Sequence, residues 1–383
     1  MATKTAQKTK NINLALQGGG AHGAFAWGVL DKLLEDGRIN VEGICATSAG
    51  TMNALAYAYG HMKGGREKAR ETLHDFWWNI HQAGQAYSPI KRLPWEKSDW
   101  NMDNSFAFFM FDSLTRLFSP YQFNPFDINP LREVLEKTIN FDELKSCQCS
   151  NLFISATHVR TGKVRVFHNH EITLDVAMAS ACLPFLFKAV TIDGEDYWDG
   201  GYMGNPALFP LFYKTKSRDI MIVHINPMER AETPTTAPEI MNRINEISFN
   251  SSLLKEMRSI AFIKKLAEHD MLKDEHKDDF KDILLHSIRA DEAMNDLSVA
   301  SKFDSDWAFL TMLRDKGRDT MQSWLDAHFD DINTRDTVDL HQEFLASVTD
   351  LFENEHGEHI HHHHDHKHSH AKKKIKKPRK NAA

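Results

Sequence analysis

Short strand-like runs alternate with segments of helical periodicity over residues 1–230, and this alternation restricts the possible folds more than any other feature of the chain. Helices are predicted at Ala24–Glu35, with Gly37 as the C-terminal stop, and at Thr51–Tyr59. An alternation of this kind predicts an α/β fold with a mainly parallel sheet. The runs expected to form strands are Ile12–Leu16, Gly43–Ala46, Asn151–Ala156, Val164–His168, Val190–Ile192 and Ile220–Ile225.

Residues 61–140 interrupt the alternation with a long, predominantly helical insertion that is rich in aromatic residues. Its first part contains Phe76, Trp77 and Trp78. Two interpretations stay open: the insertion forms a small hydrophobic subdomain core, or it forms an acyl-binding or membrane-facing lid, because large exposed apolar patches mark interaction sites. The aromatic residues of its second part are Phe106, Phe108, Phe109, Phe111, Phe118, Tyr121, Phe123 and Phe126.

The chain changes character after the α/β region. Residues 229–238 are polar and contain proline, which predicts a linker. Residues 239–355 are expected to form a helical extension packed on the core. The helices predicted there are Glu239–Leu266, Asp306–Ala327 and Asp339–Phe352.

Residues 356–383 form a low-complexity tail with nine histidines and a lysine-rich run. The tail has too few apolar residues to offset the entropy of ordering, so it is predicted to be disordered. It carries eight lysines and arginines against two acidic residues, although the whole chain has a net charge of −7. The acidic body is a poor nucleic-acid binder, whereas the tail could bind an anionic membrane or lipid inclusion, or transition metals without fixed geometry.

The composition describes a globular chain of 383 residues, with 42% hydrophobic and 26% charged residues. Four cysteines (Cys45, Cys147, Cys149 and Cys182) match neither a zinc motif nor a disulfide framework, and they are interpreted as reduced thiols of a cytoplasmic protein. The N-terminal segment has no leader-like apolar stretch, and no window approaches 18 uninterrupted apolar residues. Any lipid contact is therefore expected to be peripheral.

The segment Gly18–Gly23 (GGGAHG) lies directly after a predicted strand and directly before a predicted helix. Consecutive glycines let backbone amides converge, and the helix N-terminus adds partial positive charge, so the segment predicts a site for a phosphate or an oxyanion. It also fits the G-x-G-x-x-G pattern of dinucleotide-binding proteins. That interpretation requires an acidic residue at the end of the second strand, whereas Glu42 precedes this strand.

The second strand ends instead in Ala46-Thr47-Ser48-Ala49-Gly50. A serine between small residues at a strand-to-helix turn is typical of a nucleophile elbow, with Ala46 where the usual pattern has glycine. A third feature, Asp199-Gly200-Gly201, is by itself a common turn sequence.

In this order, GGGAHG, ATSAG, ASACLPFLFKAV (Ala179–Val190) and DGG resemble the patatin-like phospholipases, over roughly Asn13–Asn226. The resemblance implies a three-layer α/β/α catalytic domain over residues 1–228 and a Ser–Asp dyad with Ser48 as nucleophile and Asp199 as base. It also implies that Gly18, Gly19 and Gly20 line the oxyanion hole and that no cofactor or metal is required. His22 stands where the family commonly has arginine or lysine, which leaves its role open.

We therefore expect a lipid acyl hydrolase of the phospholipase A or esterase type, in which a base activates the serine and an acyl-serine forms. Transfer of the acyl group to an alcohol other than water stays possible. One alternative is a nonenzymatic protein with a patatin-type fold that binds membranes or lipid inclusions. A lesser alternative is a nucleotide-binding enzyme that uses the glycine-rich loop.

Overall fold

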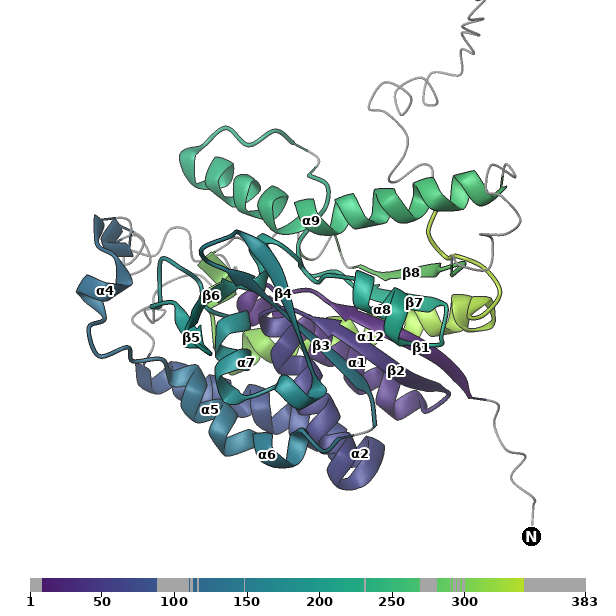
Figure 1. Ribbon diagram of the computed structural model, residues 1–383, viewed down its shortest axis with the longest axis horizontal. Helices are drawn as coiled ribbons and strands as arrows, with labels where there is room; N and C mark the ends of the chain where they lie inside the picture. The colour runs from purple at the N-terminus through teal and green to yellow at the C-terminus, as the bar shows by residue number, and fades with distance from the viewer. Residues whose placement is uncertain are drawn as a thin grey trace, which may run out of the picture. The chain divides into compact units, whose positions relative to one another are not determined.

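The computed structural model describes residues 9–340, except for 88–109, 111–112, 116, 148, 231, 269–280, 290, 292–293, 295–296 and 298–299 (Figure 1). The tail of residues 356–383 lies outside the described residues. So do nearly all of the predicted helix Asp339–Phe352 and four of the predicted insertion aromatics, Phe106, Phe108, Phe109 and Phe111.

One eight-stranded sheet forms the centre of the fold, with strand order β5-β6-β3-β2-β1-β7-β8 and β4 paired with β3. The strands β3, β2, β1, β7 and β8 run parallel, while β4 and β6 pair antiparallel with β3. The expectation of an α/β fold with a mainly parallel sheet is confirmed. The strands are β1 (Lys10–Leu16), β2 (Ile39–Ala46), β3 (Asn151–His158), β4 (Lys163–His168), β5 (Val190–Ile192), β6 (Glu195–Asp199), β7 (Asp219–Val223) and β8 (Leu284–Ile288).

Helices cover both faces of the sheet, with α9 across one face and α1, α2 and α5 on the other (Figure 1). The α-helices are α1 (Gly23–Asp36), α2 (Ala49–Tyr87), α4 (Pro120–Phe123), α5 (Pro130–Thr138), α6 (Phe141–Leu144), α7 (Leu174–Ser180), α8 (Phe209–Lys214), α9 (Ala237–Glu268) and α12 (Trp307–His328). The short 3-10 helices are η1 (Gly20–His22), η2 (Asn169–Glu171), η3 (Gly200–Tyr202), η4 (Ala300–Phe303) and η5 (Phe329–Asp331).

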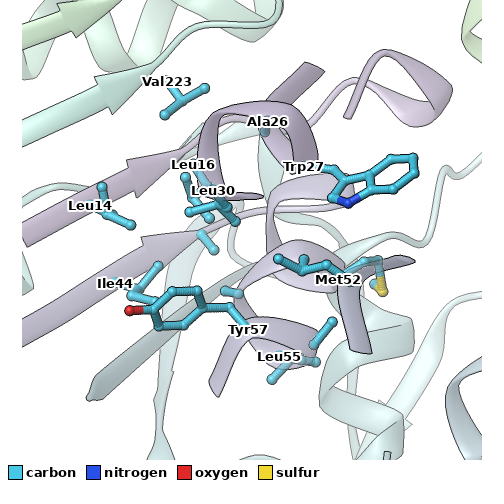
Figure 2. Packing of buried hydrophobic residues seen from close by; sticks show 14 of the residues in the cluster. Leu14, Leu16, Ala26, Trp27, Leu30, Ile44, Met52, Leu55, Tyr57 and Val223 are labelled. Atoms are coloured by element: carbon cyan, nitrogen blue, oxygen red, sulfur yellow. The ribbon is translucent and has the colours of Figure 1, made fainter. Parts of the chain in front are cut away.

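Strand side chains divide between two apolar cores because neighbouring residues point to opposite faces. Leu14 and Leu16 pack with α1 and α2 in the larger core, in which Trp27 and Tyr57 also lie (Figure 2). Ala15, between the two leucines, belongs to the smaller core under α8 and α9. Burial on both faces explains why the central strands are nearly continuous apolar runs.

Two strands, β6 and β8, have no counterpart among the predicted ones. The β6 sequence (EDYWD) contains three acidic residues, which are uncommon in strands. The β8 sequence lies in a region of helical character, where it adds a parallel edge strand beside β7. The remaining strands agree with the prediction to within four residues at either end.

The first part of the predicted insertion is continuous with the predicted helix Thr51–Tyr59. Helix α2 runs to Tyr87 and is broken only at Gly64 and Gly65, where the backbone leaves helical geometry. Phe76 and Trp77 on this helix are buried in the larger core. By contrast, Tyr121 in α4 and Phe126 shortly after this helix are 60% and 85% exposed.

Helix α1 ends as the sequence predicts, because Gly37 adopts the left-handed conformation with φ of 76° at the C-cap. The interpretation of all four cysteines as thiols is wrong for one pair. A disulfide joins Cys147 to Cys149 shortly before β3, with the two Cα atoms 5.6 Å apart. Cys45 and Cys182 are buried free thiols.

None of the helices in the described part of the chain combines the length and apolar character that a bilayer span requires. Within the same residues, no group of three or more histidine, cysteine or acidic side chains could hold a metal ion.

Candidate active site

Strand β3 brings the ends of β2 and β6 together. Strand β4 pairs with residues 153–158 of β3 and occupies one edge of that strand. Strands β2 and β6 therefore share the other edge, where β2 pairs with residues 151–154 and β6 with residues 156–158. Ala46 ends β2 opposite Ile154, and Asp199 ends β6 opposite Ala156. The turn that follows Ala46 therefore meets the end of β6, and Ser48 lies beside Asp199.

Ser48 occupies a strained turn between β2 and α2. Its φ of 53° is in the left-handed region, which is rare for a residue with a side chain and is typical of a nucleophile elbow. The Ser48 amide donates a hydrogen bond to Ser180 Oγ at 3.0 Å, and Ser180 Oγ donates to the Ser155 carbonyl at 2.8 Å. Gly50, in the first turn of α2, bonds through its amide to the Thr47 carbonyl.

Asp199 is fully buried at the end of β6. Its Oδ1 accepts a hydrogen bond from the Gly201 amide at 2.7 Å, and its own carbonyl accepts one from Thr157 Oγ1 at 2.8 Å. Among the described residues, Oδ2 has no partner with normal hydrogen-bond geometry. Burial raises the pKa of Asp199 to about 7, against opposing effects from the Gly201 amide, the nearby Ser48 hydroxyl and the Lys302 charge.

The Ser48 hydroxyl is thus close enough to lower the pKa of the Asp199 carboxyl. The two side chains do not, however, form an aligned hydrogen bond. Catalytic hydrogen bonds are often long before substrate is bound, so this geometry is compatible with proton transfer.

The glycine-rich loop packs directly on the elbow. A Cβ at Gly18 would lie 2.5 Å from the Cβ of Ser48, so only glycine fits there. The Gly18 amide donates to Asn205 Oδ1 at 2.7 Å, and its carbonyl accepts from Asn226 Nδ2 at 2.8 Å. The Gly18 amide therefore already has a hydrogen-bond acceptor and is not free to bind an oxyanion. Gly19 immediately precedes η1, and Gly20 is its first residue. The backbone amides at the start of a helix have no acceptor within that helix.

His22 is buried and neutral. Its Nε2 is 2.7 Å from Ser301 Oγ of η4, and its ring edge packs on Phe309. Burial holds the pKa of His22 well below its usual value, with the Lys302 and Arg230 charges acting in the same direction. His22 therefore fixes η1 against η4 and carries no charge at neutral pH.

Glu42, the candidate ribose ligand of the nucleotide alternative, has a different partner. Its carboxylate accepts hydrogen bonds from the Lys216 and Ser217 amides at 2.6 and 2.8 Å. It therefore holds the loop before β7 and does not face the glycine-rich loop at the end of β1.

The sequence of the α/β region matches a known family. The model of the patatin-like phospholipases matches residues 14–212, just over half of the chain. The chain belongs to the patatin-like phospholipase family. This match includes the glycine-rich loop, the Ser48 elbow and Asp199, and it ends before α9.

Two solved structures are similar to this chain at low sequence identity. VipD from Legionella pneumophila is 14% identical, with 86% of this chain and 70% of that chain covered and a TM-score of 0.40. ExoU from Pseudomonas aeruginosa, solved with SpcU, is 14% identical, with 83% of this chain and 53% of that chain covered and a TM-score of 0.31. This chain thus spans about half the length of ExoU in that structure. None of the curated proteins matches.

Three side chains around the site were not singled out from the sequence. Ser180 lies within the segment ASACLPFLFKAV noted above, and Asn205 lies shortly after Asp199, but nothing in the sequence indicates that they hold Ser48 and Gly18. Lys302, from η4, lies beyond the family match and has no local signal.

Proposed function

We propose that this family member is a serine acyl hydrolase that cleaves carboxylic esters of lipids through Ser48 and Asp199. The observation that carries the proposal is the Asp199 carboxylate, buried beside Ser48 with its pKa raised to about 7. A general base works best when its pKa is near the working pH, because it is then ionised and still basic enough to accept a proton.

In the first half-reaction, Asp199 accepts the Ser48 hydroxyl proton while Ser48 Oγ attacks the ester carbonyl carbon. The carbonyl oxygen becomes an oxyanion, which we place at the Gly19 and Gly20 amides because the Gly18 amide already donates to Asn205. When the tetrahedral intermediate collapses, the bond to the leaving alcohol breaks and the alcohol oxygen takes the proton from Asp199. The acyl group remains on Ser48.

In the second half-reaction, Asp199 accepts a proton from water as that water attacks the acyl carbon. The same oxyanion position is used again. Collapse breaks the bond to Ser48 Oγ, which recovers the proton, and the fatty acid leaves. One carboxylate therefore acts as base and then acid in each half-reaction, without a histidine.

Exposed apolar side chains support a lipid as the substrate. The segment around α4 exposes Leu117, Tyr121 and Phe126, and the loop before β5 exposes Phe185 at 67%. The two segments touch, because Lys188 Nζ donates to the Pro125 carbonyl at 2.8 Å and the Ala189 amide donates to Tyr121 Oη at 3.3 Å. We propose that they contact the lipid surface peripherally.

We expect the double variant Phe126→Ser, Phe185→Ser to bind neutral phosphatidylcholine vesicles at least about tenfold more weakly than wild type. Burial of one large apolar side chain stabilises by about 1.5–3 kcal/mol, and two are removed. Vesicle flotation measures the partition. Tyr213→Ser on α8, where the side chain is 79% exposed on another segment, is the matched control. Equal partition of the double variant and wild type would contradict this contact surface.

Fatty-acid release tests the proposed function directly. The full chain is incubated with phospholipids of several headgroups, neutral glycerides and soluble p-nitrophenyl esters, without added metal. Release from at least one ester class is the expected result, and the preferred class names the substrate. A folded protein that binds vesicles but hydrolyses no ester would favour the nonenzymatic lipid-binding alternative. Saturable quenching of tryptophan fluorescence by nucleotides would favour the nucleotide alternative.

A further inference from the structure

Lys302 of η4 places a positive charge beside the glycine-rich loop. Its Nζ donates to Asn226 Oδ1 at 2.8 Å, and Asn226 in turn donates to the Gly18 carbonyl. The backbone of Lys302 packs against Gly20, with the Lys302 carbonyl occupying the space of a Cβ there. Residues beyond the family match therefore complete the wall of the active site.

The Lys302 ammonium also faces the other side of the site. It lies 5.7 Å from the Phe249 ring centroid, and Phe249 packs against Gly201, two residues after Asp199. The positive charge of Lys302 favours the ionised form of Asp199 and so lowers the pKa of that carboxyl. The ammonium thus lies close to Asn226, which holds the glycine-rich loop, and to Phe249, which packs on the segment after Asp199.

The hydrogen-bonding capacity of Lys302 is largely unused. An ammonium group has three donors, and in the described part of the chain Lys302 uses one, with no carboxylate within ion-pair distance. The charged groups around it are Asp199 of β6, Glu246 of α9 and Arg230. Glu246 is the acidic group that most favours the charged form of Lys302, but its carboxylate is itself paired with Arg230 and Arg243.

The desolvation of this ammonium has a cost that a bound anion would offset. Burial lowers the pKa of Lys302 to about 8, so the group is still mostly charged at neutral pH. A buried charge without a paired counter-charge is unfavourable. The nearby His22 cannot share the role, because it is neutral and bonded to Ser301.

We propose that Lys302 binds the phosphate of a lipid headgroup and gives the enzyme a preference for phosphate-bearing esters; this inference rests on the proposed acyl-hydrolase function. In a glycerophospholipid the phosphate is a few covalent bonds from the ester carbonyl. With the carbonyl at Ser48 and its oxygen at the glycine-rich loop, the phosphate falls at the edge of that loop, where Lys302 lies. Lysine binds phosphate as a point charge with donors that rotate to meet it.

The test compares two soluble esters that differ only in the phosphate: dihexanoylphosphatidic acid and dihexanoylglycerol. We expect Lys302→Met to lower the ratio of kcat/KM values, phosphate ester over neutral ester, by about 10–100-fold, the range for losing a charged hydrogen bond. Lys302→Arg should keep most of the ratio. Lys316→Met, which removes an exposed lysine of α12, is the matched control and should leave the ratio unchanged. An equal loss on both esters would overturn the proposal.

A binding measurement separates this inference from the proposed function. Isothermal titration calorimetry of the full chain with decyl phosphate should give an affinity at least about tenfold weaker in Lys302→Met, whether or not any ester is hydrolysed. Lys302→Gln, which can keep the bond to Asn226 without the charge, replaces the methionine variant if that one does not fold. Unchanged decyl phosphate affinity in a folded variant would contradict the site. Inorganic phosphate that binds as tightly as decyl phosphate would overturn the headgroup assignment.

Discussion

Ser48→Ala is expected to reduce ester hydrolysis by about 10⁴-fold or more, because removing a nucleophile leaves only the rate enhancement from binding and the oxyanion site. The substitution deletes one hydroxyl and keeps the Ser48 amide bond to Ser180 Oγ, so the fold should be retained. Fatty-acid release under saturating substrate measures the loss. Ser259→Ala on α9, whose hydroxyl donates to the Lys255 carbonyl of its own helix, is the matched control.

Covalent labelling gives the same prediction a second readout. An alkyl fluorophosphonate reacts with an activated serine by losing fluoride and forming a phosphorus–oxygen bond to Oγ. We expect peptide mass spectrometry to find the adduct on Ser48 of the wild type and no adduct in Ser48→Ala. Hydrolysis that persists in the alanine variant, or an adduct on another serine with full loss of activity, would assign the nucleophile elsewhere.

The parts of the site that the sequence predicts well are those set by local structure. The Ser48 elbow and the Gly18–Gly20 loop each lie between one strand and the helix that follows it, so small residues and periodicity indicate them without knowledge of the fold. The role of Asp199 is different. Its own segment predicts only a turn, and the assignment came from the order of motifs that the family shares.

The reason Asp199 meets Ser48 lies in the sheet. Their encounter depends on β2 and β6 sharing one edge of β3, a pairing between segments about 150 residues apart in the sequence. The β6 sequence is too acidic to be recognised as a strand. Likewise, the raised pKa of Asp199 follows from complete burial, which depends on how the surrounding elements pack.

Lys302 shows the limit of motif-based prediction most clearly. No neighbouring residue in the sequence distinguishes it from other lysines. Only the packing of η4 on η1 and the bond to Asn226 connect it to the glycine-rich loop. The same packing gives His22 a buried, uncharged role that its position in the sequence leaves open.

Asp199→Asn is expected to lower kcat/KM by about 10³-fold or more, since an amide cannot accept the serine proton. In the wild type, kcat/KM should fall as the pH drops below about 7, because the base is inactive when protonated and its pKa is about 7. This acid limb should be absent from the residual activity of the variant. Asp196→Asn, an exposed aspartate on the same strand, is the control and should keep both the rate and the limb.

The stability of Asp199→Asn separates a catalytic carboxylate from a structural one. Because burial raises the pKa of Asp199 from 3.8 to about 7, the folded state holds the proton more tightly than the unfolded state. Wild-type stability should therefore decline relative to the variant as the pH rises from about 4 to 7 and level off above that, by a total on the order of 4 kcal/mol. Urea unfolding at pH 5.5, 7 and 8 measures this difference. A variant that is less stable than wild type at pH 8 would mean that the ionised carboxylate stabilises the fold. A more stable variant would mean that the buried, ionised carboxylate destabilises the fold, as expected for a base that is kept for catalysis.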